Sequence, residues 1–357
     1  MFVVIIFYRG FIDGWEQQSV TEAIEWEYGN GHLRNSDWDV SDPFTIQDGR
    51  GVLPENKRQN LSPVLLRQGS IYPEGRLMSV IIKGIKPGQQ ILDLPTQKLN
   101  ENTSGIPAII GVRMAESADL DKGDEVLLRW RDQNGTFDAA NITVAGIFNT
   151  QIAEVDNGQI WIPIKRLWQM TGLDEHATYY IANSNYQETK APGWNFVGQD
   201  KLLEDLRAMV QAERFAAYII YGLLLAVALL AIFDTQVLSI FRRQKEIGTF
   251  ISLGMTRKQV TRLFTVEGVM YSLLGTLSGV IWGMPIFIYI ANAGIGIGDL
   301  GDGLGINMAR TIYPEFGAFL IITTLFLVIG ASSLVSFMPS RKIARMDPVQ
   351  ALKGRAK

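Results

Sequence analysis

The sequence predicts a membrane-spanning α-helical protein with a large α/β domain inserted outside the membrane. Three observations carry this prediction. Long apolar segments with few charges crowd the last third of the chain, whereas residues 13–213 contain none. Lysine and arginine concentrate in two of the segments that flank the apolar runs. Residues 13–213 mix helix-like and strand-like patterns, which is typical of an α/β domain.

Three segments, 214–241, 263–291 and 316–338, have the length and apolarity of spanning helices. The first contains the apolar run Phe215–Phe233, which has no charged residue. A hydrocarbon core of about 30 Å needs about 20 such residues at about 1.5 Å each. Buried helices of a soluble protein are the less favoured alternative, because three such runs lie close together with few internal charges.

Positive charge sets the expected orientation. The link 242–262 and the tail 339–357 are rich in lysine and arginine, whereas the link 292–315 has Arg310 against three carboxylates. Because positively charged segments stay in the cytoplasm, we expect both basic segments to be cytoplasmic and residues 13–213 to lie outside. The chain is thus predicted to be a multi-pass protein of the bacterial inner membrane, with a periplasmic domain and a periplasmic loop.

The N-terminal residues pose a separate question. A domain outside the membrane needs a preceding span or signal, yet only Phe2–Tyr8 is apolar, enough for about 10 Å of helix. The segment lacks the basic start and the cleavage site of a signal peptide. We expect residues 1–12 to be the outer end of a truncated first spanning helix, which makes four spans. A buried N-terminal strand is the alternative.

Local patterns predict individual elements of the outside domain. Asn134-Gly135 lies between two apolar-rich runs and is a strong hairpin signal. The frequent tryptophans and tyrosines are interpreted as core or interface anchors, in preference to a cargo-binding surface. The predicted elements are a helix at Trp15–Glu27, a strand at Arg76–Ile85, a helix at Val112–Ala118, and a hairpin of Glu125–Arg131 with Ala140–Ile147.

The link 242–262 has the apolar spacing and the start and stop signals of a short helix with fixed ends. Its apolar spacing predicts a helix at Glu246–Leu253, which Gly254 ends by adopting a left-handed conformation. Thr256, followed by Gln259, predicts a capping box at the start of the next helix. We interpret this segment as a docking surface. The alternative is a solvated basic loop.

The spans contain two further features. Gly275, Gly279 and Gly283 are spaced four apart, which favours close helix packing within or between subunits over chance enrichment. Asp234 is a membrane-proximal carboxylate, and such residues are functional candidates by default. Its place near the inner headgroups favours a local structural role over proton relay.

Several function classes are disfavoured. The net charge of −3 argues against nucleic-acid binding. The chain has no cysteine and 2 histidines, His32 and His176, which argues against thiolate catalysis and a metal site. The pattern Gly296-x-Gly298-x-x-Gly301 lacks the preceding strand of a dinucleotide site, and no phosphate-binding loop occurs. We expect no catalytic residue, metal ligand or cofactor in this chain.

Two motifs resemble one family. The pattern R-x-x-E-I-G-x-x-x-S-L-G-M-T at Arg243–Thr256 and the tail PSRKIARMDPVQAL at Pro339–Leu352 are similar to FtsX-like permeases, which include MacB-like and LolC/LolE-like members. Ile109–Leu128 resembles, more loosely, a stretch of the lipoprotein-releasing permeases. The resemblance implies a type VII ABC permease with four spans and an inserted periplasmic α/β domain.

The resemblance also implies partners and a mechanism. A separate cytoplasmic ABC ATPase would bind ATP and Mg²⁺, and two permeases would form a homo- or heterodimer. The expected function is transmission of ATP-driven motion for lipoprotein or lipid extraction or export, with a periplasmic lipoprotein or chaperone and membrane lipids as further partners. The alternatives are an FtsX-like signalling subunit that transports nothing and a membrane-anchored binding protein. The expected ATPase contacts are Glu246, Ile247, Leu253, Gly254 and Met255.

Overall fold

The computed structural model describes residues 2–150, 153–296 and 310–343, and the chain forms two compact units. We call them the helical unit and the sheet unit. The glycine pattern that ends at Gly301 and most of the C-terminal tail lie outside the described residues. The helical unit comprises Met1–Glu16, Met209–Ile295 and Ile312–Lys357, and the sheet unit comprises Gln17–Ala208 and Gly296–Thr311.

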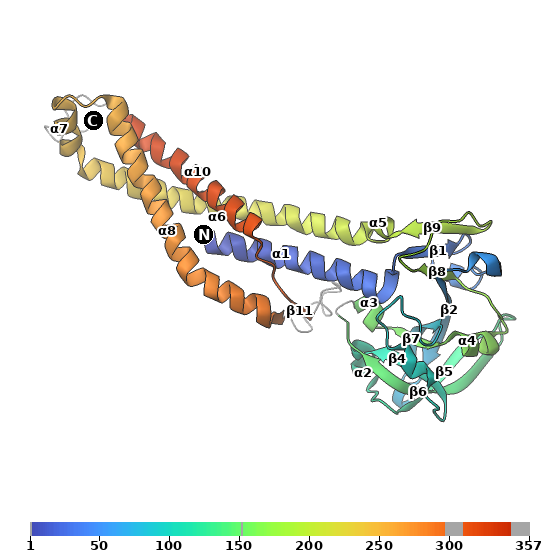
Figure 1. Cartoon of the computed structure of the whole chain (residues 1–357). Coiled ribbons are helices and arrows are strands. Elements are labelled where there is room, and N and C mark those ends of the chain that lie inside the picture. Colours follow the sequence, from blue (N-terminus) through green and yellow to red (C-terminus); the bar gives the residue numbers. More distant parts are fainter. Residues whose placement is uncertain (1, 151–152, 297–309, 344–357) are drawn as a thin grey trace. The chain divides into compact units, whose positions relative to one another are not determined.

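Long helices dominate the helical unit (Figure 1). In the described part of the chain, three helices are long and apolar enough to cross a membrane. Two of them contain the predicted spans 214–241 and 263–291, and the third begins at Ala318, two residues after the predicted start of the span 316–338. The predicted count of four spans stays a prediction. The helices are α1 (Phe2–Ala23), α6 (Glu204–Arg242), α7 (Gln244–Ser252), α8 (Arg257–Ala293) and α10 (Ala318–Ile343).

The N-terminal residues form a helix, so the alternative of a buried N-terminal strand is wrong. The physical reason is their packing: Phe2 and Ile6 of α1 are buried in a cluster with Phe287 of α8 and Leu320 and Val328 of α10. Since side chains four residues apart lie on the same face of a helix, α1 presents this apolar pair to its neighbours. The helix runs without a break to Ala23 and continues as a short π-helix, η1 (Ile24–Tyr28).

A nine-stranded sheet forms the second unit, and six of its strands close into a ring. The strand order is β3-β7-β4-β6-β5-β2-β8-β1-β9, and β3 also pairs with β2. The long strand β2 makes closure possible, because different stretches of it pair with β3, β5 and β8. The strands are β1 (Gly31–Asn35), β2 (Leu61–Ile71), β3 (Met78–Ile85), β4 (Ile106–Gly111), β5 (Glu125–Arg131), β6 (Phe137–Phe148), β7 (Gln159–Pro163), β8 (Tyr179–Ala182) and β9 (Trp194–Gly198).

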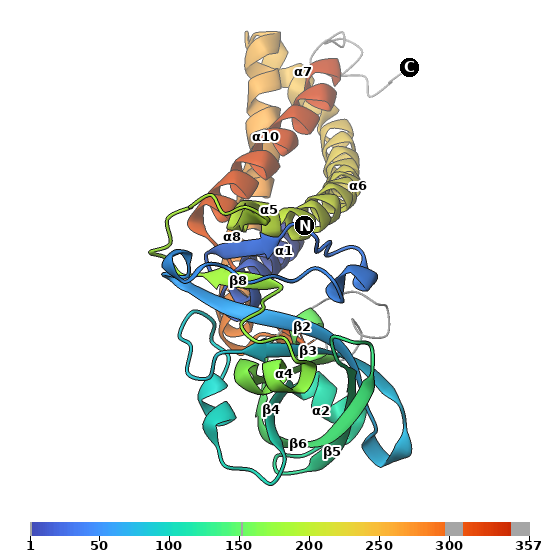
Figure 2. The ribbon, with the colours of Figure 1, turned by 90° about the vertical axis from the view of Figure 1, so that its right-hand side faces the viewer.

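Apolar residues are buried on both faces of this sheet. In β2, Leu65 belongs to one buried cluster while its neighbours Val64 and Leu66 belong to another, as the alternation of side chains along a strand requires. Helices α2 (Val112–Ala118) and α4 (Ile164–Thr171) pack on strands of the closed ring (Figure 2). The aromatic residues fill these clusters, which confirms that they serve as core.

The local predictions in this unit hold closely. The predicted helix at Val112–Ala118 is α2. The predicted hairpin is formed by the antiparallel strands β5 and β6, and Gly135 in its turn has a φ of +83°. Strand β6 is longer than predicted and runs from Phe137 to Phe148. Its start is extended because residues 137–139 continue the pairing with β5, and its last residue, Phe148, pairs with Gly111 of β4, a contact distant in sequence.

Candidate functional site

Helix α7 is a short helix held between two turns. It follows Arg243, whose backbone leaves the helical conformation at the end of α6. Its C-terminal end is closed by two hydrogen bonds, from the Met255 N–H to the Phe250 carbonyl and from the Gly254 N–H to the Ile251 carbonyl. Gly254 has a φ of +97°, so this cap favours glycine. The predicted helix end is confirmed.

The start of α8 is fixed by the predicted capping box. The Gln259 N–H donates to the Thr256 hydroxyl, and the Thr256 N–H donates to the Gln259 side chain at 2.8 Å. Both bonds satisfy backbone donors that a helix start otherwise leaves unpaired. Helices α7 and α8 are therefore joined by a short connection with a defined conformation at each end.

One face of α7 is buried against the neighbouring helices. Ile247 is 2% exposed and packs with Ile240 of α6 and with Val260 and Phe264 of α8. Met255 lies partly buried against the same cluster. This buried face is an apolar mount that ties α7 to two long helices.

Arg243 adds ion pairs to the apolar contacts of the mount. Its Nε donates to the Glu246 carboxylate at 2.7 Å, and its Nη1 donates to both oxygens of Glu267 at 2.9 Å. The guanidinium also lies 5.0 Å from the ring centroid of Phe264. The hydrogen bonds from Arg243 to Glu246, together with the charge of Glu267, raise the pKa of Arg243.

Small residues bring the long helices into close contact. A Cβ at Gly268 of α8 would lie 2.4 Å from Oγ of Ser336 on α10 and 2.9 Å from Nε2 of Gln236 on α6. One helical turn further on, Ser272 donates to Ser332 at 3.0 Å. Helices α8 and α10 therefore approach too closely at this point for any larger side chain.

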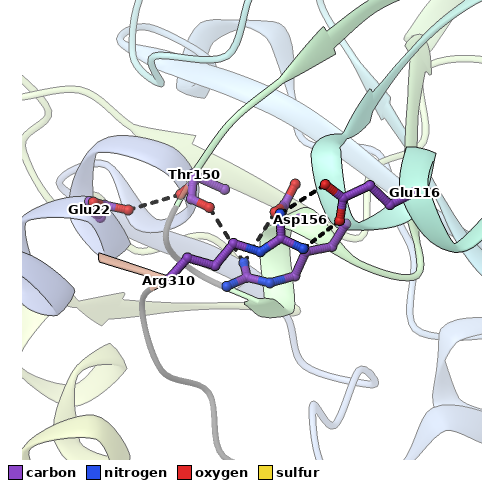
Figure 3. Close-up of polar contacts among 6 residues, drawn as sticks. Glu22, Glu116, Thr150, Asp156 and Arg310 are labelled. Carbon is purple, nitrogen blue, oxygen red and sulfur yellow. Dashed lines mark hydrogen bonds and ion pairs between the residues drawn. The ribbon is translucent and has the colours of Figure 1, made fainter. Parts of the chain in front are cut away.

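The sheet unit holds a separate polar cluster (Figure 3). Arg113 and Asp156 form an ion pair of 3.1 Å, and their side chains are 4% and 1% exposed. Arg310 forms a two-pronged ion pair with Glu116 of α2, with Nη1 at 3.0 Å from Oε1. Residue 310 is thereby bound to the domain formed by residues far earlier in the chain. The cluster consists of Glu22, Arg113, Glu116, Thr150, Asp156 and Arg310.

Burial dominates the chemistry of two titratable groups in the sheet unit. Burial raises the pKa of Asp156 to about 6, although the backbone N–H and the charge of Arg113 act in the opposite direction. Burial, together with the charge of Arg34, lowers the pKa of His32 to about 3. The His32 ring is stacked on the Tyr179 ring, with 4.5 Å between the ring centroids, so this neutral imidazole belongs to the core.

The family follows from comparison with known proteins. Residues 218–348, which contain α7 and α8, match the FtsX-like permease C-terminal family. The chain is an FtsX/MacB-like ABC transporter permease. The lipoprotein-releasing system transmembrane protein LolC of Neisseria meningitidis is 22% identical over 362 residues, which cover 90% of this chain and 83% of LolC.

Two further comparisons cover smaller regions of the permease. The macrolide export ATP-binding/permease protein MacB of Wolinella succinogenes is 31% identical over 138 residues, 38% of this chain and 19% of MacB. Thus the permease matches most of LolC but only about a fifth of MacB. The periplasmic region of MacB from Actinobacillus actinomycetemcomitans has a TM-score of 0.35 and 9% identity, and covers 53% of this chain and 98% of that one.

The structure separates the five predicted ATPase contacts of the permease into two groups. Leu253 is 79% exposed and Glu246 is also exposed. Among the described residues, nothing lies within 4 Å of a Cβ at Gly254. Ile247 and Met255 face the mount instead. Sequence reasoning missed Arg243 and Glu267 as parts of this site, although both lie in or beside the recognised motif. Their opposite charges were the signal from which an ion pair could have been predicted.

The predicted packing glycines also divide. Cβ atoms at Gly279 and Gly283 would lie 3.3 Å and 3.2 Å from Val3 of α1, whereas no described residue of another element comes within 4 Å of a Cβ at Gly275. Asp234 is exposed, and its side chain forms no hydrogen bond or ion pair with another residue in the described ranges. The tightest glycine contact, at Gly268, lies outside the predicted series.

Proposed function

We propose that this chain is the subunit that transmits ATP-driven motion across the bacterial inner membrane for lipoprotein or lipid extraction or export. In this proposal a separate ABC ATPase binds ATP and Mg²⁺ and docks on α7. The supporting observation is the combination of a fixed mount with an exposed apolar end, Leu253. A helix held on one face and open on the other is suited to receive force from a partner.

The exposed end of α7 has the chemistry of a protein contact. A large apolar side chain that is 79% exposed beside a glycine can enter a pocket of a partner, and such apolar anchors dominate the energetics of many interfaces. Glu246 adds a charge next to this anchor, and its bond to Arg243 holds it in place. We assign the direct contact to Glu246, Leu253 and Gly254, with Ile247 and Met255 as their support.

Helix continuity supports transmission. Helix α6 runs unbroken from Glu204 to Arg242, 39 residues, which corresponds to about 58 Å at about 1.5 Å per residue. A displacement at α7 acts on the adjoining end of α6 through the mount. Since an α-helix is stiff on this scale, the far end of α6 is expected to follow.

Lipoprotein is the favoured cargo, because the match to LolC extends over 83% of that protein. The match to MacB covers 19% of MacB. A second permease subunit is part of the proposal, and the open face at Gly275 is a candidate contact for it. A signalling role predicts the same ATPase capture but no lipoprotein retained by the purified complex, and this outcome would replace the cargo assignment.

The central test is capture of the ATPase by a Leu253→Asp variant of the full-length chain. A buried carboxylate at this anchor costs at least about 1.4 kcal/mol, so we expect capture to weaken about tenfold or more. The measurement is co-purification of the ABC ATPase with affinity-tagged permease in detergent.

Phe44→Asp provides the matched control. Phe44 is 85% exposed and belongs to the domain predicted to lie on the other side of the membrane. This variant should capture the ATPase as the unmodified chain does. Equal capture by the Leu253→Asp variant would rule out docking through the exposed end of α7.

A further inference from the structure

The helical unit contains a pocket at the start of α8 and the end of α10. Its volume is about 730 Å³. The first residue that lines it is Arg257, which is also the first residue of α8 and follows the connection from α7. The residues that line it include Arg257, Lys258, Arg262, Val266, Phe337 and Arg341.

Four of these residues are cationic and have no acidic partner. Within the described ranges, none of the four lies within 4.0 Å of a carboxylate. The nearby Arg243 differs, since it is paired with both Glu246 and Glu267. Positive charges that converge on a pocket without a counter-charge favour the binding of an anion.

The pocket changes from charged to apolar along α8. Arg257, Lys258 and Arg262 come first, and Val266, 50% exposed, follows at the start of the apolar span. On α10 the order is reversed, as expected for an antiparallel neighbour: Phe337, 39% exposed, precedes Arg341. The pocket therefore offers cations at one end and apolar surface at the other.

We propose that this pocket binds an anionic phospholipid of the cytoplasmic leaflet. The phosphate headgroup lies among the four cationic side chains, and an acyl chain lies along Val266 and Phe337. Basic pockets between spanning helices on the cytoplasmic side suit anionic headgroups. A zwitterionic lipid fits less well, because its ammonium group would meet four positive charges. A free phosphate ion would leave the apolar half of the pocket unused.

This inference rests on the membrane orientation in the proposed function and on nothing about the ATPase or the cargo. The test therefore uses the purified full-length chain alone. Native mass spectrometry from detergent measures bound phosphatidylglycerol and phosphatidylcholine with matched acyl chains. Parallel samples contain sodium phosphate, which supplies the anion without the acyl chain.

The test variant is Arg262→Gln with Arg341→Gln, and its control is Arg242→Gln with Lys245→Gln. Both remove two positive charges at the same membrane face, but Arg242 and Lys245 do not line the pocket. Each cation near an anionic headgroup strengthens the binding of that headgroup. We therefore expect the test variant to bind phosphatidylglycerol about tenfold more weakly or worse, while the control keeps its preference over phosphatidylcholine.

Three results would overturn the proposal. One is phosphatidylglycerol binding by the test variant at the level of the control. The second is displacement of the lipid by sodium phosphate at equal concentration, which would identify a soluble anion site. The third is equal binding of phosphatidylglycerol and phosphatidylcholine by the unmodified chain, which would show that the pocket does not select an anionic headgroup.

Discussion

Arg243 serves three neighbours with one guanidinium group. It donates to Glu246 at the start of α7 and to Glu267 on α8, and it lies over the ring of Phe264. A guanidinium offers five donors in a planar fork, whereas an ammonium is a compact charge that cannot reproduce this geometry. The residue between α6 and α7 is thus suited to its place by its shape as much as by its charge.

We predict that Arg243→Lys loosens α7. The loss of one charge-assisted hydrogen bond of about 1.5 kcal/mol should raise the rate of amide hydrogen exchange in residues 244–252 about tenfold. Hydrogen-exchange mass spectrometry of the chain in detergent provides the measurement. Arg242→Lys is the control, because Arg242 has no ion pair among the described residues. Unchanged exchange in both variants would mean that the apolar mount alone holds α7.

Close packing of α8 and α10 depends on small side chains at defined positions. Gly268 faces Ser336 and Gln236, and Ser272 bonds to Ser332 across the helix pair. Without a hydrophobic driving force between helices in a membrane, such close contacts and interhelical hydrogen bonds provide the attraction. The same helix carries Gly275, where no other element in the described part of the chain comes within 4 Å of an added Cβ. Two glycines on one helix therefore have different surroundings.

We predict opposite effects of alanine at these two glycines. Gly268→Ala forces α8 and α10 apart and should cost about 1–3 kcal/mol, a typical value for overpacking. Gly275→Ala should be neutral or slightly stabilising, since alanine favours helix over glycine by about 1 kcal/mol. Thermal unfolding of the helices in detergent, followed by circular dichroism, should show a lower melting temperature for Gly268→Ala alone. A similar melting temperature for both variants would contradict the close approach of Gly268 to Ser336.

Unfolding of the two units can be followed by different spectroscopic signals. Six of the 8 tryptophans belong to the sheet unit, whereas the helical unit holds Trp15 and Trp282. Tryptophan fluorescence therefore reports mainly on the sheet unit, and helical circular dichroism reports mainly on the long helices. The sheet unit also contains the buried ion pair of Arg113 and Asp156.

We predict that stability of the sheet unit falls between about pH 4 and about pH 6. The pKa of Asp156 is about 6 in the folded chain and about 3.9 when unfolded. The folded state therefore binds the proton more tightly, so its contribution is full below about pH 4 and is lost as pH rises through 6. The loss should be at most about 3 kcal/mol, because solvent screening reduces the full effect of the pKa difference. It is measured as urea unfolding followed by tryptophan fluorescence.

Asp156→Asn isolates this effect. The variant places a neutral amide where the wild type has a carboxyl that is protonated below its pKa of about 6. Its stability should therefore stay close to that of the wild type near pH 4 and lack the decline between pH 4 and 6. The exposed Asp174→Asn serves as control and should keep the wild-type profile. If Asp156→Asn keeps the decline, another group is responsible for it.

The sequence by itself determined the features that depend on neighbouring residues. Apolar length located the spanning helices, the Gly254 stop and the Thr256–Gln259 box bounded α7 and α8, and Asn134-Gly135 located a hairpin. These signals are local because helix capping, turns and apolar runs are decided within a few residues. The family motif at Arg243–Thr256 located the candidate ATPase contacts for the same reason.

Tertiary structure decided everything that joins distant residues. Only the fold shows that Ile247 faces inward while Leu253 is free, because the apolar pattern of α7 does not say which residue a neighbour will cover. Glu267 lies 24 residues from Arg243 and Asp156 lies 43 residues from Arg113. Such pairs form when helices and strands pack. The energy that selects them comes from burial and close contact, which a one-dimensional pattern does not contain.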